Sequence, residues 1–412
     1  MKSLFVRASR PEALYTPGET ITFLVNGSEI GEPVDYAIYH HSTGLLAKGQ
    51  TRINTEIRIR AEKPGFLEIR LSGCGETISA VAAAAVAPEQ ISTILPPPPD
   101  LFEFWNSEIE NQKRLATAAE RHPIPAIGED AYRKWHQQWP IFNRTIEQEP
   151  FPEIETFEFS ADTLHGNPAR GYLAFPKHAK RGSLPALLTL HGAGVADSDF
   201  PKTCSAAKNG FLAMDINAHG LPCGQTPDFY RNLSNSTLKD YFKIGRENGK
   251  TSYLVAIYLR ALRALDFLTK QPEWDGKNLI TWGCSQGGCL ALVCASLDLR
   301  VSKCCAGVPA FCDCADSRFA AWSLLNRNDP PALSQTVLEQ MQYCSVAHLV
   351  SHASAKAYFT VGFIDSTCPP ASVYAAYNQY KGPKKIYNAP DSGHSNIPTE
   401  IWMDDFTRFM KA

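Results

Sequence analysis

The pattern of apolar runs after residue 150 most constrains the fold of this 412-residue chain. Compact apolar runs alternate there with stretches of helical character, notably Tyr253–Thr269 and Gln286–Leu297. The runs that predict strands are Gly171–Phe175, Ala186–Leu190, Phe211–Ile216, Asn278–Trp282, Cys305–Val308 and Ala357–Val361. Because nearly continuous apolar strands must be covered on both faces, this alternation predicts an α/β fold with a mostly parallel sheet.

The first 88 residues follow a different pattern. Short runs of β-forming residues are separated by turn signals such as Pro17-Gly18 and Lys63–Gly65. The segment Thr51–Arg60 alternates apolar and polar residues, as a half-buried strand does. We therefore predict a small all-β, immunoglobulin-like sandwich over residues 1–88. The run Ser79–Val86 is too short to span a bilayer and is predicted to be a buried strand of this sandwich.

A proline-rich segment joins the two regions. Pro96–Pro99 favours polyproline II over helix or sheet. Asp100 is predicted to cap a helix over Leu101–Arg121 that enters the second region. The predicted domains are the β-sandwich (1–88), the proline-rich linker with its entry helix (89–150) and the α/β domain (151–412).

Composition narrows the classes of partner. Lys plus Arg number 40 and Asp plus Glu 42, with no basic run, so we expect no nucleic-acid partner and no membrane partner. The N-terminus lacks the apolar centre of a signal peptide. We expect a cytoplasmic protein if the chain is complete, and a periplasmic or secreted one if a signal peptide was removed. The cysteines are expected to be free, buried thiols, as at Cys284, Cys289 and Cys294.

The strongest chemical signal is the pentapeptide Gly283–Gly287, which reads Gly-Cys-Ser-Gln-Gly and is followed by Gly288. It fits the nucleophile elbow Gly-x-Ser-x-Gly, in which the glycines permit a tight turn from strand to helix. The pentapeptide follows a predicted strand and precedes a predicted helix, which is the context that the motif requires. Ser285 is therefore the predicted nucleophile of a serine hydrolase, and a glycine-rich turn without catalytic role is the alternative.

A serine hydroxyl needs a base, and α/β-hydrolases carry their triad in the order serine, acid, histidine. His394 lies in a glycine loop after a late strand and is the predicted general base. Asp365 directly follows the strand that ends near Val361 and is predicted to orient the imidazole. Asp391 is the rival acid, but in the same glycine loop as His394 it would stabilise the turn instead.

An oxyanion hole requires two backbone N–H donors. The first is predicted to come from Gln286, the residue after the nucleophile. The second is predicted to come from the loop His191–Gly194, with Ala193 as the donor. A plain tight turn after a strand is the alternative for this loop.

Metal and nucleotide chemistry find little support. His348 and His352 lie four residues apart, but no third ligand accompanies them. Cys304-Cys305 and the pair Cys312 and Cys314 do not form a Cys-x-x-Cys motif. Glycines form no phosphate-binding loop after a strand. We expect no metal and no organic cofactor.

From about Asp100 onward, the chain resembles the acetyl xylan esterase and cephalosporin C deacetylase family, carbohydrate esterase family seven. The matching residues are Pro99–Trp105, the Ser-Gln-Gly-Gly elbow ending at Gly288, and Val361–Ser372 leading to Gly393-His394. The resemblance implies an α/β-hydrolase that removes acetyl groups from acetylated sugars such as xylan or xylo-oligosaccharides. It also implies Ser285, Asp365 and His394 as the triad and an oxyanion donor at Ala193.

Two segments depart from the family pattern. Asn217–Gly224 stands where the family has an Arg-Gly-Gln-Gly-Gly-Ser stretch, and Ser395 stands where a glutamate usually follows the histidine. Both lie near the site or the subunit contacts, so the preferred sugar and the acetyl position stay open. The family's ring-like hexamer suggests a homo-oligomer, which the added β-domain could block or replace.

The expected activity is that of a carboxylic ester hydrolase that deacetylates an acetylated oligosaccharide or polysaccharide through an acyl-enzyme. A prolyl-oligopeptidase-like serine peptidase also joins a β-domain to this fold, but that β-domain is usually much larger. A polysaccharide-binding protein on an inactive hydrolase scaffold is the third interpretation, and the intact triad argues against it.

Overall fold

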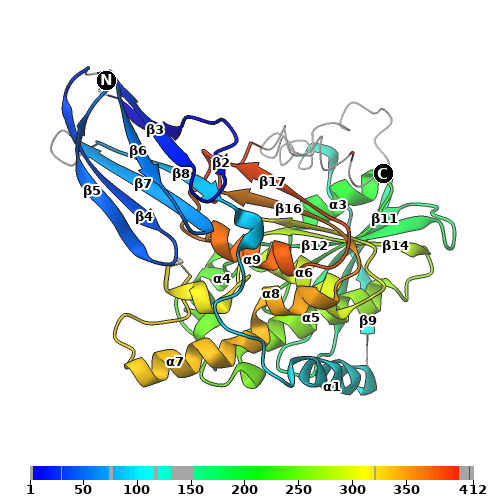
Figure 1. Cartoon of the computed structure of the whole chain (residues 1–412). Coiled ribbons are helices and arrows are strands. Elements are labelled where there is room, and N and C mark those ends of the chain that lie inside the picture. Colours follow the sequence, from blue (N-terminus) through cyan, green and yellow to red (C-terminus); the bar gives the residue numbers. More distant parts are fainter. Residues whose placement is uncertain are drawn as a thin grey trace.

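Among the residues that the structure describes, a nine-stranded sheet forms the larger part of the molecule (Figure 1). The structure is a computed structural model that describes residues 3–28, 30–73, 78–115, 119–130, 153–319, 322–398 and 408. The strand order is β17-β16-β15-β14-β12-β13-β11-β10-β9. The strands are β9 (Ala119–Pro123), β10 (Ile154–Ala161), β11 (Ala169–Pro176), β12 (Leu184–Leu190), β13 (Leu212–Asn217), β14 (Trp274–Cys284), β15 (Lys303–Gly307), β16 (Lys356–Gly362) and β17 (Lys384–Ala389).

The predicted mostly parallel sheet is confirmed. From β13 across to β17, every neighbouring pair of strands is parallel. Strands β9, β10 and β11 pair in antiparallel fashion at one edge. The carboxyl ends of parallel strands meet at one edge of a sheet, which brings the loops after β12, β14, β16 and β17 together.

Helices cover both faces of this sheet. On one face, α5 (Tyr253–Leu268), α6 (Gln286–Leu297), α8 (Val346–Leu349) and α9 (Pro370–Gln379) contact one another in sequence. On the other face, α3 (Phe200–Lys208) packs against β11 and β13. Alternate residues of β13 serve the two faces, since Met214 belongs to the main core and Ala213 to a small cluster under α3. Within the described ranges, no helix is long and apolar enough to cross a membrane.

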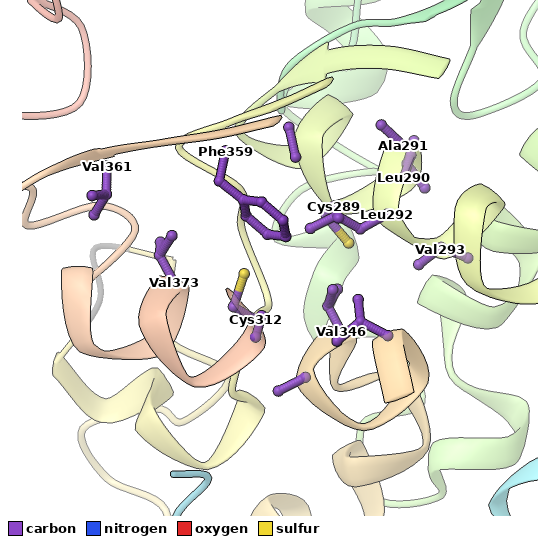
Figure 2. Packing of buried hydrophobic residues seen from close by; sticks show 14 of the residues in the cluster. Cys289, Leu290, Ala291, Leu292, Val293, Cys312, Val346, Phe359, Val361 and Val373 are labelled. Atoms are coloured by element: carbon purple, nitrogen blue, oxygen red, sulfur yellow. The ribbon is translucent and has the colours of Figure 1, made fainter. Parts of the chain in front are cut away.

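The main core lies between α6 and the centre of the sheet. Figure 2 shows Leu292 and Val293 of α6 in the same apolar cluster as Phe359 of β16 and Val346 of α8. All four side chains are fully buried. Each such burial stabilises the fold by roughly 1.5–3 kcal/mol, so α6 and the elbow before it are held firmly against the sheet.

The entry helix α1 (Leu101–Arg114) is shorter than predicted. Arg121 lies instead in strand β9, where it pairs with Phe159 of the sheet edge, so sheet pairing overrides the local helical pattern. Asp100 occupies the N-cap position but makes no capping hydrogen bond, because its carboxylate binds Lys250 and Tyr343. The predicted linker after residue 130 lies outside the described residues.

Two β-sheets form the N-terminal part of the chain, as predicted. One contains β1 (Leu4–Ala8), β3 (Thr20–Gly27) and β6 (Thr55–Arg60), and it is antiparallel throughout. The other contains β2 (Leu14–Tyr15), β4 (Pro33–His40), β5 (Gly44–Arg52), β7 (Gly65–Gly73) and β8 (Ile78–Val86). Phe23 of the first sheet and Ile69 of the second are completely buried, because each sheet turns one face inward.

The prediction of one strand over Thr51–Arg60 was wrong. Strand β5 ends at Arg52 and pairs with β4, whereas β6 begins at Thr55 and pairs with β3 of the other sheet. Between them Asn54 adopts a φ of 65°, a left-handed conformation that asparagine tolerates in turns. The alternating pattern is real in each half, but a turn carries the chain from one sheet to the other.

The β-sheets pack directly on the α/β region near β16 and α9 (Figure 1). The Phe66 ring meets that of Phe363 at a centroid distance of 5.1 Å and that of Tyr374 at 5.7 Å. The Asn378 side-chain amide donates to the carbonyls of Pro88 and Ile91, both at 2.9 Å. We propose that the chain is divided into domains at residues 1–88, 89–150 and 151–412. The contacts of Phe66 and Asn378 then form the junction between the first domain and the last.

Phe66→Ala should lower the free energy of unfolding by about 3–5 kcal/mol, because it opens a cavity between the β-sheets and Phe363. Phe66 is 3% exposed. Phe5 is 53% exposed, so the control Phe5→Ala should change stability by less than about 0.5 kcal/mol. Urea unfolding followed by fluorescence measures both, and equal stability of the two variants would contradict the prediction.

Candidate active site

Ser285 lies at the turn between β14 and α6. Its φ of 59° and ψ of −122° are rarely adopted by residues other than glycine and cost about 1–3 kcal/mol. A Cβ on Gly287 would lie 2.0 Å from the Leu190 carbonyl oxygen, and one on Gly283 would lie 2.4 Å from the Gly287 carbonyl carbon. The two motif glycines are therefore required, because the start of α6 crosses the end of β12 backbone to backbone.

The loops after β16 and β17 bring Asp365 and His394 together. His394 Nδ1 donates to Asp365 Oδ2 at 2.8 Å. The other carboxylate oxygen accepts from the backbone N–H groups of Thr367 and Cys368, both at 2.8 Å. The Asp365 side chain is completely buried, whereas Asp391 is exposed. The acid that contacts His394 is thus Asp365, and the contact leaves Nε2 as the basic ring nitrogen.

Cys368 connects this pair to the serine. Its Sγ lies within 4.8 Å of a carboxylate oxygen of Asp365 and of a ring nitrogen of His394. Its thiol also lies beside Ser285. Burial raises the pKa of this thiol, so it stays protonated. Among the described side chains, Ser285 and His394 do not share a direct hydrogen bond in this arrangement. Catalytic hydrogen bonds are often long without substrate and tighten when it binds.

A hollow opens above Ser285, and we call it the active-site hollow. Ala193 and Cys368 lie near the serine, Phe311 and Trp322 offer aromatic faces, and the remaining lining includes Pro309, Ala310, Cys312, Asp313, Cys314, Asp316, Thr367, Pro369 and Ser372. The hollow thus combines apolar faces with a few carboxylate and hydroxyl groups, which is typical of small-molecule sites.

The predicted oxyanion donors lie on either side of Ser285. Gln286 is the first residue of α6, so its N–H has no partner within the helix and lies at the positive end of the helix dipole. Ala193 lines the same hollow as Ser285. Both positions can present a backbone N–H to an oxygen beside the serine.

Two buried histidines hold the loop that carries Ala193. The Ala218 N–H donates to His191 Nε2 at 3.1 Å, so Nδ1 carries the proton and donates to the Gly192 carbonyl at 2.7 Å. His219 Nε2 donates to the Gly194 carbonyl at 3.1 Å. These bonds fix both carbonyls that flank Ala193.

Both histidines are neutral in the folded protein. Burial, together with the neighbouring His191, lowers the pKa of His219 to about 3. Burial also lowers the pKa of His191. The Tyr253 hydroxyl lies 3.1 Å from His219 Nδ1 and donates to it, which stabilises the neutral tautomer.

Comparison with known proteins identifies the family. The family model described as "Acetyl xylan esterase (AXE1)" matches residues 141–411. The chain belongs to the acetyl xylan esterase family. It is therefore a carboxylic ester hydrolase of the α/β-hydrolase fold that acts on acetylated carbohydrates.

Individual relatives agree with this assignment. The acetyl esterase Axe7A of Xylanibacter ruminicola is 28% identical over 95% of this chain and 87% of its own length. An acetyl xylan esterase from Paenibacillus sp. R4 has a TM-score of 0.63 at 23% identity, over 79% of this chain and 98% of its own. Acetyl xylan esterase 1 from Thermoanaerobacterium sp. JW/SL YS485 has a TM-score of 0.59 at 22% identity, over 78% and 96%. The two solved structures share the fold.

The supporting histidine of this esterase was missed by the sequence analysis. His219 lies in the segment Asn217–Gly224 that departs from the family pattern. The Asn217 side chain in the same segment donates to the Ala196 carbonyl at 2.7 Å. Because β13 is parallel to β12, the segment after β13 lies beside the loop after β12, and that adjacency was the available signal.

A single cluster of possible metal ligands occurs among the described residues of the esterase, and it is Asp365, Cys368 and His394. An ion there would compete with the hydrogen bond between Asp365 and His394. His348 Nε2 instead lies 2.8 Å from the Gln342 side-chain oxygen, and the His352 ring lies against that of Phe102 in a tilted arrangement.

The described cysteines of the esterase are all free, and all but one are buried as predicted. The exception is Cys284, which was predicted to be buried and is exposed. It is the last residue of β14, where the strand gives way to the elbow.

Gly287→Ala should destabilise the enzyme by about 3 kcal/mol or more and abolish esterase activity, since the added methyl overlaps the Leu190 carbonyl. Gly128 has nothing within 4 Å of an added Cβ, so Gly128→Ala should remain folded and active. Thermal unfolding and ester hydrolysis measure both. Full activity of Gly287→Ala would contradict the crossing of α6 over β12.

The stability of the enzyme should fall in acid partly through His219. The unfolded chain binds a proton there below about pH 6.5, whereas the folded chain does so near pH 3. The contribution of neutral His219 to the free energy of unfolding is therefore complete above about pH 6.5. It is lost by about 1.4 kcal/mol per pH unit as the pH falls from there toward about 3. Between pH 7.5 and 5, the wild type should lose about 2 kcal/mol more than His219→Gln in urea unfolding. Exposed His122→Gln is the control, and parallel pH curves for wild type and His219→Gln would refute the assignment.

Proposed function

We propose that the enzyme deacetylates acetylated xylo-oligosaccharides through an acyl-enzyme, with Ser285, His394 and Asp365 as its catalytic triad. The observation that carries the proposal is the 2.8 Å hydrogen bond from His394 to the buried Asp365, beside a strained serine at the elbow. The carboxylate holds the imidazole with Nε2 free to accept a proton. No metal and no organic cofactor are needed for this chemistry.

In the first half-reaction, Ser285 Oγ attacks the carbonyl carbon of the acetyl ester while His394 Nε2 accepts the hydroxyl proton. Backbone N–H groups of Gln286 and Ala193 donate to the oxyanion that forms. His394 then gives its proton to the sugar oxygen that leaves. Water attacks the acetyl-serine in the second half-reaction, with His394 again as base, and acetate is released.

The chemistry of the active-site hollow supports a sugar as the leaving group. Trp322 and Phe311 supply apolar faces on which the C–H face of a sugar ring can lie. Asp313 and Asp316 supply carboxylate oxygens that can accept hydrogen bonds from hydroxyl groups. The segment Asn217–Gly224, which departs from the family pattern, supports the loop with Ala193 through His219. It therefore leaves the proposed reaction type unchanged.

Ser285→Ala should lower kcat for p-nitrophenyl acetate by roughly 10⁴-fold or more, because the nucleophile is removed. The wild type should hydrolyse the acetate faster than the butyrate and octanoate esters, and it should release acetate from acetylated xylotetraose. A wild type no faster than Ser285→Ala on every ester would refute the esterase mechanism. Turnover of aryl acetate alone would refute only the proposed sugar substrate.

Asp365→Asn should lower kcat by roughly 10⁴-fold, because an amide cannot hold the same imidazole tautomer or stabilise the imidazolium. The matched control is Asp391→Asn, which changes the rival carboxylate in the same way. That variant should keep kcat within about threefold of wild type, in the range of surface changes. The reverse result would transfer the orienting role from Asp365 to Asp391.

A further inference from the structure

A second hollow lies where the N-terminal β-sheets meet the α/β region, and we call it the junction hollow. His41 and Ser42, from the turn after β4, line one side. Ser92 and Ile94, from the chain that follows the β-domain, line another side. This hollow is made by parts of the chain that lie far apart in the sequence, including residues before the segment that matches the family model.

The junction hollow adjoins the active-site hollow. Asp313, Asp316 and Ser372 line both of them. Ser285 and Trp322 line the active-site hollow alone, and His41 lines the junction hollow alone. A chain of sugar units that leaves the reacting centre past this common wall therefore meets the β-domain.

The common wall holds its carboxylates in fixed positions. Asp313 accepts from the backbone N–H of Ile94 at 2.9 Å and from that of Ala315 at 3.0 Å. Asp316 Oδ2 accepts from the Ser372 hydroxyl at 2.7 Å. Both acids are buried. Carboxylates held this way have lost their side-chain entropy before a ligand arrives, and carboxylate oxygens can accept hydrogen bonds from hydroxyl groups.

The β-domain side offers donors. The Phe66 N–H donates to His41 Nδ1 at 3.2 Å, so the ring proton lies on Nε2, which is a donor. Ser42 lies beside it, and its hydroxyl is 3.0 Å from His40 Nδ1. Ser42 and Ser92 are exposed. The hollow thus faces a ligand with acceptors on one side and with donors and hydroxyls on the other, which suits the hydroxyl groups of a sugar.

We propose that the junction hollow binds the glycosyl units next to the acetylated one, so that the β-domain contributes to the recognition of oligosaccharides by chain length. The inference rests on the proposed function, because it places the reacting sugar over Ser285. It assigns the β-domain a part in substrate selection beyond its packing on the acid loop, which is the loop after β16 that carries Asp365.

The test blocks the hollow without touching the triad. Ser42→Trp and Ser92→Trp place an indole in its mouth, and Ser72→Trp, on an exposed residue of β7 outside it, is the matched control. Substrates are p-nitrophenyl acetate, peracetylated xylose and acetylated xylotetraose. We expect kcat/KM for the tetraose to fall about tenfold in both blocking variants, about 1.4 kcal/mol of binding, while the two short substrates and the control are unaffected.

A binding measurement separates this inference from the proposed function. Unacetylated xylotetraose is titrated into Ser285→Ala with and without Ser42→Trp, and binding is followed by calorimetry. Xylotetraose binding that is lost in the double variant supports the junction hollow even if the wild type deacetylates no sugar. Equal losses on all three substrates, or unchanged tetraose kinetics and binding, would overturn the inference. Melting temperatures of the variants identify any loss that comes from unfolding.

Discussion

The crossing of α6 over the end of β12 is the contact on which the rest of the site depends. Gly287 approaches the Leu190 carbonyl so closely that no side chain fits between them. This approach forces Ser285 into a strained backbone conformation and turns the first N–H groups of α6 toward the same point. The apolar core beneath α6 (Figure 2) offsets the strain, because every residue of the helix except Leu297 is buried.

The parallel pairing of the strands then brings the other groups of the site together, and no further sequence motif is needed for it. The loops after β12, β14, β16 and β17 share one edge of the sheet (Figure 1), so residues about two hundred positions apart are brought to the same edge. Each loop has its own support. Two neutral histidines hold the loop with Ala193, and backbone N–H groups of Thr367 and Cys368 hold Asp365.

The β-domain is joined to this machinery at a sensitive place. Phe66 packs on Phe363, two residues before Asp365, so the core of the β-sheets and the acid loop share one apolar contact. In the segment that follows β8, the backbone N–H of Ile94 donates to Asp313 in the wall of the active-site hollow. A domain without a catalytic motif is thereby coupled to the geometry of the proposed triad and to the shape of the proposed substrate path.

The sequence by itself determined the α/β class, the elbow at Ser285 and the candidates Asp365 and His394, because periodicity and glycine spacing are local properties of the chain. It also indicated the family. Only the tertiary structure decided that Thr51–Arg60 changes sheets, that Arg121 joins a strand and that Asp100 binds Lys250 instead of capping a helix. It likewise revealed His219 and the junction hollow. These features depend on partners distant in sequence, and a hydrogen bond or a shared wall between such partners leaves no local pattern in either segment.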